Sequence, residues 1–271
     1  MGVVNVTPDS FSDGGLHFDP GAAIAHGREL AAQGAAMLDV GGESTRPGAD
    51  PVPAEEERHR VIGVIEGLAE TGAQLSIDTS KLAVAEAALD AGATYVNDVT
   101  AFRGEPALAG LVASRGADCC LMHMLGTPRT MQEDPRYDDV VDDVRAFLEE
   151  RLAFAVSEGI AEERVMLDPG IGFGKTVAHN LELLRRLDEI VALGRPVVVG
   201  ASRKSFLGKI TGRDVGERAV ATAAVNVLAL ERGASIFRVH DVAESLDALT
   251  VATATLAGGW PERIPRTTTT T

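Results

Sequence analysis

ALDAGATYVND, residues 88–98, contains the pattern that decides the fold. An alanine-rich helical pattern ends at Gly92-Ala93, a short apolar run follows, and polar side chains stand where that run ends. Glycine supplies the left-handed end of a helix, and the apolar run suits a buried parallel strand. The Gly-Ala pair recurs ahead of other apolar runs at 34–35, 116–117 and 233–234. These repeats predict a unit of helix, turn and strand that is used several times.

Short apolar runs are spaced along the whole chain with helical patterns between them. Runs of this kind predict parallel strands that are covered on both faces. We expect eight strands, at residues 3–6, 37–40, 75–77, 94–96, 119–122, 165–167, 197–199 and 236–239. We expect helices to begin at Pro20 after Asp19 and to occupy residues 81–91, 138–150, 178–193, 215–232 and 241–257.

Eight strands, each followed by a helix over about 260 residues, match an α/β fold of the (β/α)8 TIM barrel type. A doubly wound open sheet also alternates strands and helices, but polar residues at nearly every strand end favour a closed barrel. We predict one barrel domain over residues 1–260 and a disordered tail at 261–271. The loops at 7–19 and 41–53, after the first two strands, are long enough to serve as lids or binding loops.

The charge balance excludes several classes of protein. The 271 residues carry 25 Lys and Arg against 40 Asp and Glu, a net charge of −15, so general attraction to nucleic acid or to an anionic membrane is not expected. Aromatic residues make up 4%, too few for base-stacking surfaces. No apolar stretch approaches the roughly 20 residues of a membrane span. Cys119 and Cys120 are adjacent and expected to be reduced, so we predict a cytoplasmic protein.

Polar side chains gather where the predicted strands end. In a barrel these positions face one shared mouth, where catalytic groups lie. Any one of them alone is usually a helix cap or a structural hydrogen bond, but the same feature repeated from strand to strand indicates a functional site. The residues in chain order are Asn5, Asp39, Asp78, Asn97, Asp98, His123, Asp168, Ser202, Arg203, Lys204, Arg238 and His240.

Several motifs resemble those of the bacterial dihydropteroate synthase family over essentially the whole chain. They are MGVVNVTPDSFSDGG at 1–15, GGESTRPG at 41–48, DPGIGFGKT at 168–176, SRKS at 202–205 and RVH at 238–240. Members of that family are (β/α)8 barrels that join (7,8-dihydropterin-6-yl)methyl diphosphate to 4-aminobenzoate and release diphosphate. The resemblance implies a transferase of folate biosynthesis that uses Mg²⁺, is a target of sulfonamides and forms a homodimer.

The aminopyrimidinone edge of a pterin presents neighbouring N–H donors, which a buried carboxylate can accept with charge-assisted strength. Asp78 and Asp168 are placed for that role, although Asp78 could instead cap a helix and Asp168 could serve a turn before Pro169. The resemblance assigns pterin binding to Asp78, Asn97, Met122, Asp168, Lys204 and Arg238. It makes Asp168, Lys204, Arg238 and His240 the catalytic residues.

A leaving diphosphate requires cations and donors aimed at its oxygens. The resemblance assigns this role to Asn5, Thr45, Arg238 and His240, with Asn5 as the ligand of Mg²⁺, an ion that often takes only one or two protein ligands. Asn5 could instead be a strand-end hydrogen bonder, and His240 could be a helix N-terminal residue. Arg46, Arg203, Lys204, Arg238 and His240 form a cationic cluster suited to two anionic substrates.

The resemblance places 4-aminobenzoate against Phe11, Thr45, Arg46, Pro47, Phe173 and Ser205, although Phe173 could equally be a plain hydrophobic residue. The implied reaction is dissociative: the C–O bond breaks first and the arylamine then attacks the cation. Because an aromatic amine is neutral near pH 7, no strong general base is required. Closure of the two long loops would exclude water.

Two local patterns are misleading. The stretch 170–176 looks like a phosphate-binding P-loop, but Pro169 stands where that motif requires glycine. Met122-His123-Met124 has no Cys or His cluster beside it, so soft-metal binding is not expected. A pterin-binding module without activity and a pterin-dependent methyltransferase are the alternative functions. The loop motifs disfavour the methyltransferase, and the presence of Asn5, Arg238 and His240 disfavours the inactive binder.

Overall fold

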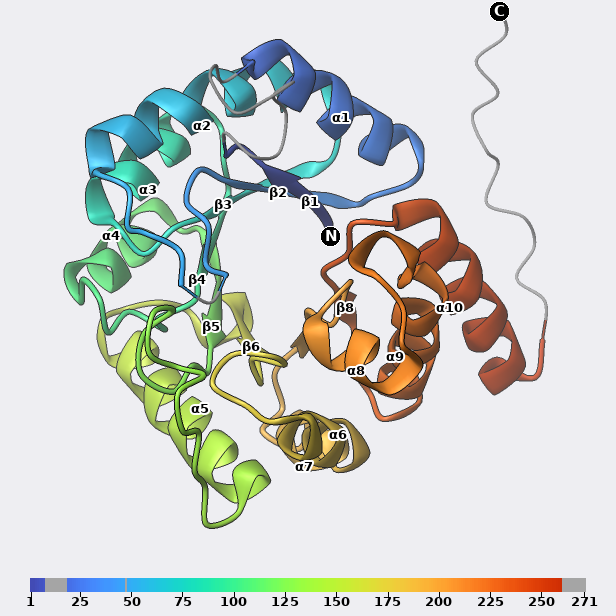
Figure 1. Ribbon diagram of the computed structural model, residues 1–271. Helices are drawn as coiled ribbons and strands as arrows, with labels where there is room; N and C mark the ends of the chain where they lie inside the picture. The colour runs from blue at the N-terminus through green and yellow to red at the C-terminus, as the bar shows by residue number, and fades with distance from the viewer. Residues whose placement is uncertain (8–18, 47, 260–271) are drawn as a thin grey trace, which may run out of the picture.

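The computed structural model describes residues 1–7, 19–46 and 48–259. Eight parallel strands form a ring and the helices surround it, as Figure 1 shows. All eight predicted strands are present, with ends shifted by one or two residues. They are β1 Gly2–Asn5, β2 Met37–Gly41, β3 Gln74–Asp78, β4 Tyr95–Asp98, β5 Asp118–Met122, β6 Val165–Asp168, β7 Val198–Val199 and β8 Ile236–Phe237.

The ring is closed. Strands β1 to β6 pair in chain order, and β7 pairs with β8. Two parallel bridges complete the circle, Leu167 with Val197 between β6 and β7, and Gly2 with Val239 between β8 and β1. At the second junction the Val3 amide donates to the Val239 carbonyl at 3.0 Å. The structure therefore confirms the predicted barrel and excludes the doubly wound open sheet.

Ten α-helices lie within the described ranges. They are α1 Pro20–Ala32, α2 Ala54–Leu68, α3 Leu82–Asp90, α4 Ala107–Arg115, α5 Val140–Ser157, α6 Val177–Arg185, α7 Leu187–Val191, α8 Ser205–Thr211, α9 Ala219–Glu231 and α10 Val242–Ala257. The predicted start of α1 is confirmed, because the Asp19 carboxylate accepts the Gly21 amide at 2.8 Å. Among these helices none is both long enough and apolar enough to cross a bilayer.

Two predicted helices are interrupted. The single helix expected over 178–193 is two helices, because Arg186 leaves helical geometry (φ −110°, ψ 30°). The Arg186 guanidinium pairs with Asp139, the N-cap residue of α5, and with Glu189. The helix expected over 215–232 starts as the 3₁₀ turn Val215–Glu217, and α9 begins only at Ala219. These differences leave the ring of strands unchanged.

The repeated Gly-Ala pairs end helices as predicted. Gly34, Gly92, Gly116 and Gly233 all have positive φ, between 59° and 111°. Each following alanine is buried and donates its amide to a carbonyl in the last turn of the helix, for example Ala93 to Ala88 at 3.0 Å. The chain thereby turns directly from each helix into the next strand.

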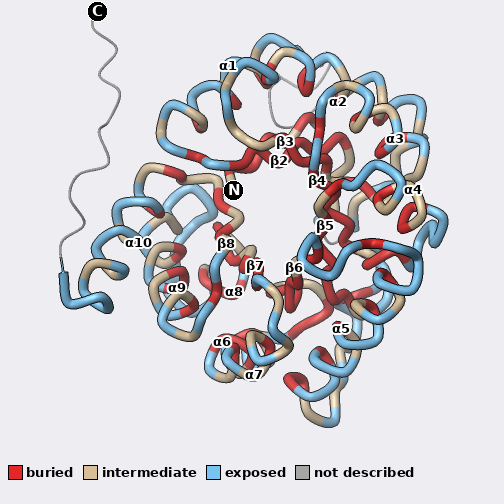
Figure 2. Tube along the Cα trace, turned by 180° about the vertical axis from the view of Figure 1, so that it is seen from behind, coloured by how far each residue is buried: buried red, intermediate tan, exposed pale blue. Residues whose placement is uncertain are grey.

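The main core lies between the strands and the surrounding helices, and Figure 2 shows that buried residues gather around the ring. A second cluster fills the barrel itself. Because alternate residues of a strand point inward, side chains of β2, β4, β6 and β8 form one layer, Met37, Tyr95, Met166 and Ile236. Cys119 belongs to the outer core and Cys120 to the barrel interior, and both are free thiols.

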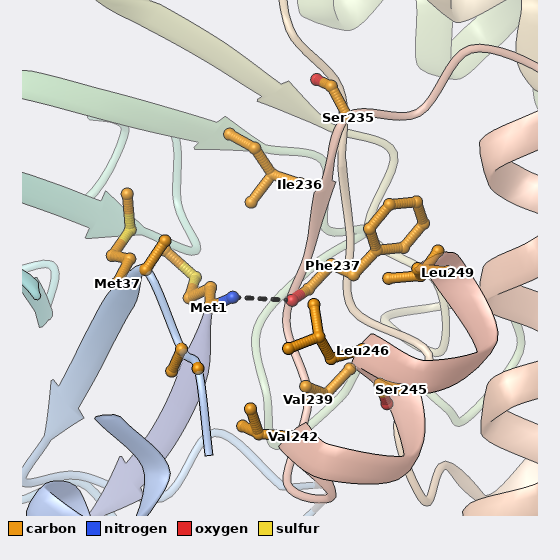
Figure 3. Close-up of a pocket in the computed structure, with 13 residues that line it drawn as sticks. Met1, Met37, Ser235, Ile236, Phe237, Val239, Val242, Ser245, Leu246 and Leu249 are labelled. Atoms are coloured by element: carbon orange, nitrogen blue, oxygen red, sulfur yellow. Dashed lines mark hydrogen bonds between the residues drawn. The ribbon is translucent and has the colours of Figure 1, made fainter. Parts of the chain in front are cut away.

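The floor of the barrel, at the amino ends of the strands, holds an apolar pocket between β1, β8 and α10. Figure 3 shows Met1 in its wall, where the terminal amino group donates to the Phe237 carbonyl at 3.0 Å. Apolar side chains such as Leu246 and Leu249 line the rest. This pocket lies at the opposite end of the barrel from the polar residues described next.

Candidate active site

The layer two residues further along the even-numbered strands is polar. Asp39, Asn97, Asp168 and Arg238 follow Met37, Tyr95, Met166 and Ile236 at the inward-facing spacing of two. The alternation that packs the barrel floor with apolar side chains thus presents two carboxylates, an amide and a guanidinium near its mouth. Because every second residue of a strand faces inward, these side chains come together although they are distant in sequence.

Arg238 is the centre of a buried hydrogen-bond network. Its Nε donates to Asp39 Oδ2 at 2.6 Å, and its Nη2 donates to Asp78 Oδ2 at 2.8 Å. Asn97 Nδ2 donates to the same Asp39 oxygen at 3.0 Å, and the Ser76 hydroxyl donates to the other. Asp39 is fully buried, so Arg238 and these donors compensate a charge that water cannot reach. Asp39 was predicted only as one of the polar strand ends, with no ligand assigned to it.

Two further carboxyl groups border this network. Burial raises the pKa of Asp78 to about 7, although Arg238 opposes the shift. Asp78 is not a helix cap, because α3 begins after Lys81, so that alternative is wrong. Burial also raises the pKa of Asp168, with Lys204 opposing. Asp168 Oδ1 accepts the Gly170 amide at 2.7 Å, so one oxygen does serve the turn that was its alternative role.

Lys204 reaches the mouth from the turn that follows β7. Arg203 has φ 57°, a left-handed conformation that reverses the chain between the strand and α8. The Lys204 ammonium donates to the Ile171 carbonyl and lies 4.1 Å from the centre of the Phe173 ring. Burial lowers the pKa of Lys204 to about 7, while Asp168 opposes the shift. Phe173 therefore packs against a cation at the mouth.

His240 is held by Ser202. The Ser202 hydroxyl accepts the His240 amide at 3.1 Å and lies within hydrogen-bond distance of His240 Nδ1, at 3.0 Å. These two contacts fix the orientation of the imidazole ring. Burial, together with Arg238 and Arg203, lowers the pKa of His240 to about 4. Asp241 rather than His240 is the N-cap residue of α10, so the helix-end alternative is wrong.

The β6–α6 loop, residues 169–176, lies over the end of β5. Gly170 has φ 68°, and a Cβ there would lie 1.8 Å from the His123 carbonyl oxygen, so only glycine fits. Lys175 turns inward, with its Nζ 2.8 Å from His123 Nδ1 and 3.0 Å from the Phe173 carbonyl. Burial lowers the pKa of Lys175 well below its ordinary value. Lys175 thus supports the loop from beneath, and sequence reasoning missed this role.

Comparison with known proteins identifies the family. The sequence profile of the pterin binding enzymes matches residues 1–240. The dihydropteroate synthase of Escherichia coli K12 is 46% identical over 258 residues, which cover 95% of this chain and 91% of that protein. The chain belongs to the dihydropteroate synthase family. Members of this family are transferases of folate biosynthesis.

Solved dihydropteroate synthases share the fold. The Xanthomonas albilineans enzyme with 4-aminobenzoic acid has a TM-score of 0.89 and 50% identity, covering 94% of this chain and 92% of that chain. The enzyme of the same organism in complex with 7,8-dihydropteroate has a TM-score of 0.86 and 48% identity with the same coverage. These neighbours and the closed ring agree on a TIM barrel.

The structure places the remaining predicted synthase residues as follows. Asn5 ends β1, and Met122 ends β5 in an apolar cluster with Phe173 at its edge. Ser205 is the exposed first residue of α8. Phe11 and Pro47 lie outside the described residues.

The residues of the predicted cationic cluster are paired to different extents. Arg203 donates to Asp241 through two guanidinium nitrogens, and Arg238 donates to Asp39 and Asp78. The Lys204 ammonium donates to a backbone carbonyl instead. Arg46 is exposed on the β2–α2 loop, residues 42–53, and its charge contributes to lowering the pKa of His240. Thr45 precedes it, half-buried.

Proposed function

We propose that the chain joins (7,8-dihydropterin-6-yl)methyl diphosphate to 4-aminobenzoate with the residues at the mouth of the barrel. The observation that supports this assignment most strongly is the buried layer of Asp39, Asn97, Asp168 and Arg238, bordered by Asp78 and Lys204. Its carboxylates can accept from the N–H donors of a pterin edge, and its cations can bind a diphosphate. A planar ligand that carries several N–H groups and an anionic substituent therefore matches both kinds of group.

Pterin recognition is assigned to the inner, buried part of this site. Asp168 has one oxygen bound to the Gly170 amide, and its other oxygen can accept from the pterin. Asp78 and Asn97 provide further polar contacts, Lys204 donates to the carbonyl side of the ring, and Met122 packs against it. Arg238 orients Asp78 and approaches the leaving group. The burial of these groups makes each charge-assisted contact stronger than it would be in water.

The diphosphate is assigned to Asn5, Thr45, Arg238 and His240. The Asn5 side chain at the end of β1 offers a carboxamide oxygen, a donor of the kind that Mg²⁺ takes, and so fits an ion held jointly with the diphosphate. Mg²⁺ commonly binds one or two protein ligands, phosphate oxygens and water. The Asn5 amide oxygen would hold the ion, which would neutralise charge on the diphosphate.

The reaction proceeds by dissociative substitution. The bond between the pterin methyl carbon and the diphosphate oxygen breaks, and its electron pair leaves with the diphosphate, where Arg238 and the His240 imidazole stabilise the charge. The neutral nitrogen of 4-aminobenzoate attacks the resulting carbon cation and then loses one proton to solvent. Lys204 and Asp168 hold the pterin during both steps. No general base of triad type is required.

The second substrate is assigned to the rim. Thr45 and Arg46 approach from the β2–α2 loop, Phe173 packs on the aryl ring, and Ser205 with Arg46 meets the carboxylate; Phe11 and Pro47 complete the assignment by resemblance. These rim residues would exclude water from the carbon cation, because water would otherwise react with it in place of 4-aminobenzoate.

The proposal predicts that the purified chain, supplied with both substrates and Mg²⁺, forms dihydropteroate and diphosphate in equal amounts. Enzyme-coupled diphosphate detection and chromatographic detection of the product measure the two. Omitting 4-aminobenzoate should slow diphosphate release, since only water then captures the cation. Tight pterin binding without diphosphate release would instead identify a binding module and overturn the proposal.

The chain is further proposed to be one barrel domain over residues 1–260, to reside in the cytoplasm and to form a homodimer. The buried, free thiols of Cys119 and Cys120 fit a reducing compartment.

The outer face of α9 and α10 supports the dimer, because α10 buries only Val242 and Ser245 while large apolar side chains are exposed. They are Val220, Leu228, Leu246, Val251 and Leu256. No charged residue occurs over 248–259.

The dimer proposal predicts that Val251→Asp/Leu256→Asp lowers the solution mass to that of a monomer, because two charges cannot be buried in an apolar interface. Light scattering after size-exclusion chromatography measures the mass. Leu181→Asp on α6, also an exposed leucine, is the control and should leave the mass unchanged. A wild-type chain that already runs as a monomer would contradict the proposal.

A further inference from the structure

The β2–α2 loop carries Thr45 and Arg46, and its two ends meet at one carboxylate. Glu43, at the start of the loop, accepts the amide of Val52, near the end of the loop, at 3.3 Å. Glu43 lies in the GGESTRPG motif but was assigned no role in the sequence analysis. It is thus placed to set the shape of the whole segment.

Lys81 binds this carboxylate from another element. Its ammonium donates to Glu43 and to Glu57 of α2. The side chain of Lys81 is 21% exposed, that of Glu43 is 24% exposed and that of Glu57 is 1% exposed, so water screens the three charges little. Burial alone lowers the pKa of Lys81, but the hydrogen bonds to the two glutamates outweigh it and the pKa rises. Lys81 therefore stays charged and joins the loop to α2.

Two cations hold the base of the loop, Lys81 through Glu43 and Glu57, and Arg60, whose Nη1 donates to the Gly42 carbonyl at 2.7 Å. Glu57 Oε1 is buried and has no hydrogen-bond partner within the described ranges, so the carboxylate relies on Lys81 at its other oxygen. Next to it, a Cβ on Gly42 would lie 2.8 Å from Val61 Cγ1 and 3.0 Å from Glu57 Cγ, so the loop backbone packs directly on α2. Without Lys81, two carboxylates would face each other in this tight contact.

The outer part of the same loop is held weakly. Asp50 pairs with Arg129, but these side chains are 84% and 66% exposed. The Gly48 amide donates to the Pro128 carbonyl at a long 3.4 Å. Exposed ion pairs contribute little to stability, so the position of the loop is set mainly at its base.

We propose that Lys81 is a positioning residue for the 4-aminobenzoate side of the site. It latches the β2–α2 loop through Glu43 and Glu57 and so fixes where Thr45 and Arg46 stand. Lys81 lies three residues after Asp78, so the same connection also joins the pterin side to the loop. The effect on 4-aminobenzoate rests on the proposed function. The latch itself rests only on the contacts of Lys81 with Glu43 and Glu57.

Lys81→Met tests the latch by a difference between the two substrates. The KM for 4-aminobenzoate should rise by about tenfold or more, because a buried pair is broken. The KM for the pterin diphosphate should change far less. Amide hydrogen exchange over 42–53 should become faster. Arg115→Met, which breaks the exposed Arg115–Asp90 pair, is the matched control and should change none of these.

The double variant Lys81→Met/Glu57→Gln distinguishes loss of folding from loss of the latch. Removing the uncompensated buried charge should restore thermal stability, while the KM for 4-aminobenzoate stays raised because Glu43 still lacks its cation. A folded Lys81→Met with unchanged exchange over 42–53, or with both KM values raised equally, would overturn the proposal. If the wild-type chain forms no dihydropteroate, the proposed function fails, and the exchange comparison still decides the latch.

Discussion

Arg238→Met is expected to lower kcat/KM for dihydropteroate formation by about a hundredfold or more, since a donor to the developing charge is removed. It is also expected to lower the free energy of unfolding by about 3–5 kcal/mol, because Asp39 and Asp78 are left buried without a cation. Arg238 binds both carboxylates at 2.6 and 2.8 Å, and its side chain is 23% exposed. Diphosphate release and urea-induced unfolding measure the two effects.

The two effects of Arg238 can be separated. Arg238→Met/Asp39→Asn removes one uncompensated carboxylate and should recover part of the stability without recovering turnover. Arg164→Met, which breaks a pair with Asp118 where the Arg164 side chain is 46% exposed, is the control and should alter both quantities little. Near-normal turnover in a folded Arg238→Met would show that the diphosphate is bound elsewhere.

The barrel could be predicted because its signals are local. A glycine that ends a helix, an apolar run and a polar strand end all lie within a dozen residues, as in 88–98, and they recur along the chain. The break at Arg186 was not predicted, because the helical pattern continues through it and one of its partners, Asp139, lies 47 positions away. A helical pattern in one stretch carries no information about such a partner.

The candidate site rests on a signal of the same kind. Asp78, Asp168 and His240 were proposed because strand ends share one mouth, whatever their distance in sequence. Asp39 was recognised only as a strand end, since its partner Arg238 lies 199 positions away. The latch at Lys81 also depends on partners from other elements, and no spacing rule indicates it.

Charge pairing is the property that sequence reveals least. The net charge of −15 conceals a mouth where Lys204 and Arg238 stand among buried carboxylates. Arg203 lies next to Lys204 and pairs with Asp241, while Arg238 pairs with Asp39 and Asp78. None of these partners can be read from the number of cations that follow the strands.

Asp168→Asn is expected to weaken pterin binding by about a hundredfold or more. The Asp168 oxygen that does not accept the Gly170 amide can accept two pterin N–H donors, and these two charge-assisted contacts, at about 1.5–3 kcal/mol each, would become neutral ones. Lys204 would also lose the carboxylate that opposes the fall of its pKa. Asparagine preserves the size of the side chain and an acceptor for the Gly170 amide, so the fold should survive. Calorimetric titration with a dihydropterin alcohol measures binding without turnover.

Ser205→Ala provides the contrast within the same mouth. Ser205 is exposed at the start of α8, so water replaces its hydroxyl at little cost, and we expect only a few-fold rise in the KM for 4-aminobenzoate, about 1 kcal/mol or less. Pterin affinity should not change. The ordering follows from burial: a charge that water cannot replace controls binding, and a hydroxyl that water can replace does not. Small and equal effects of the two substitutions would show that the pterin lies away from Asp168.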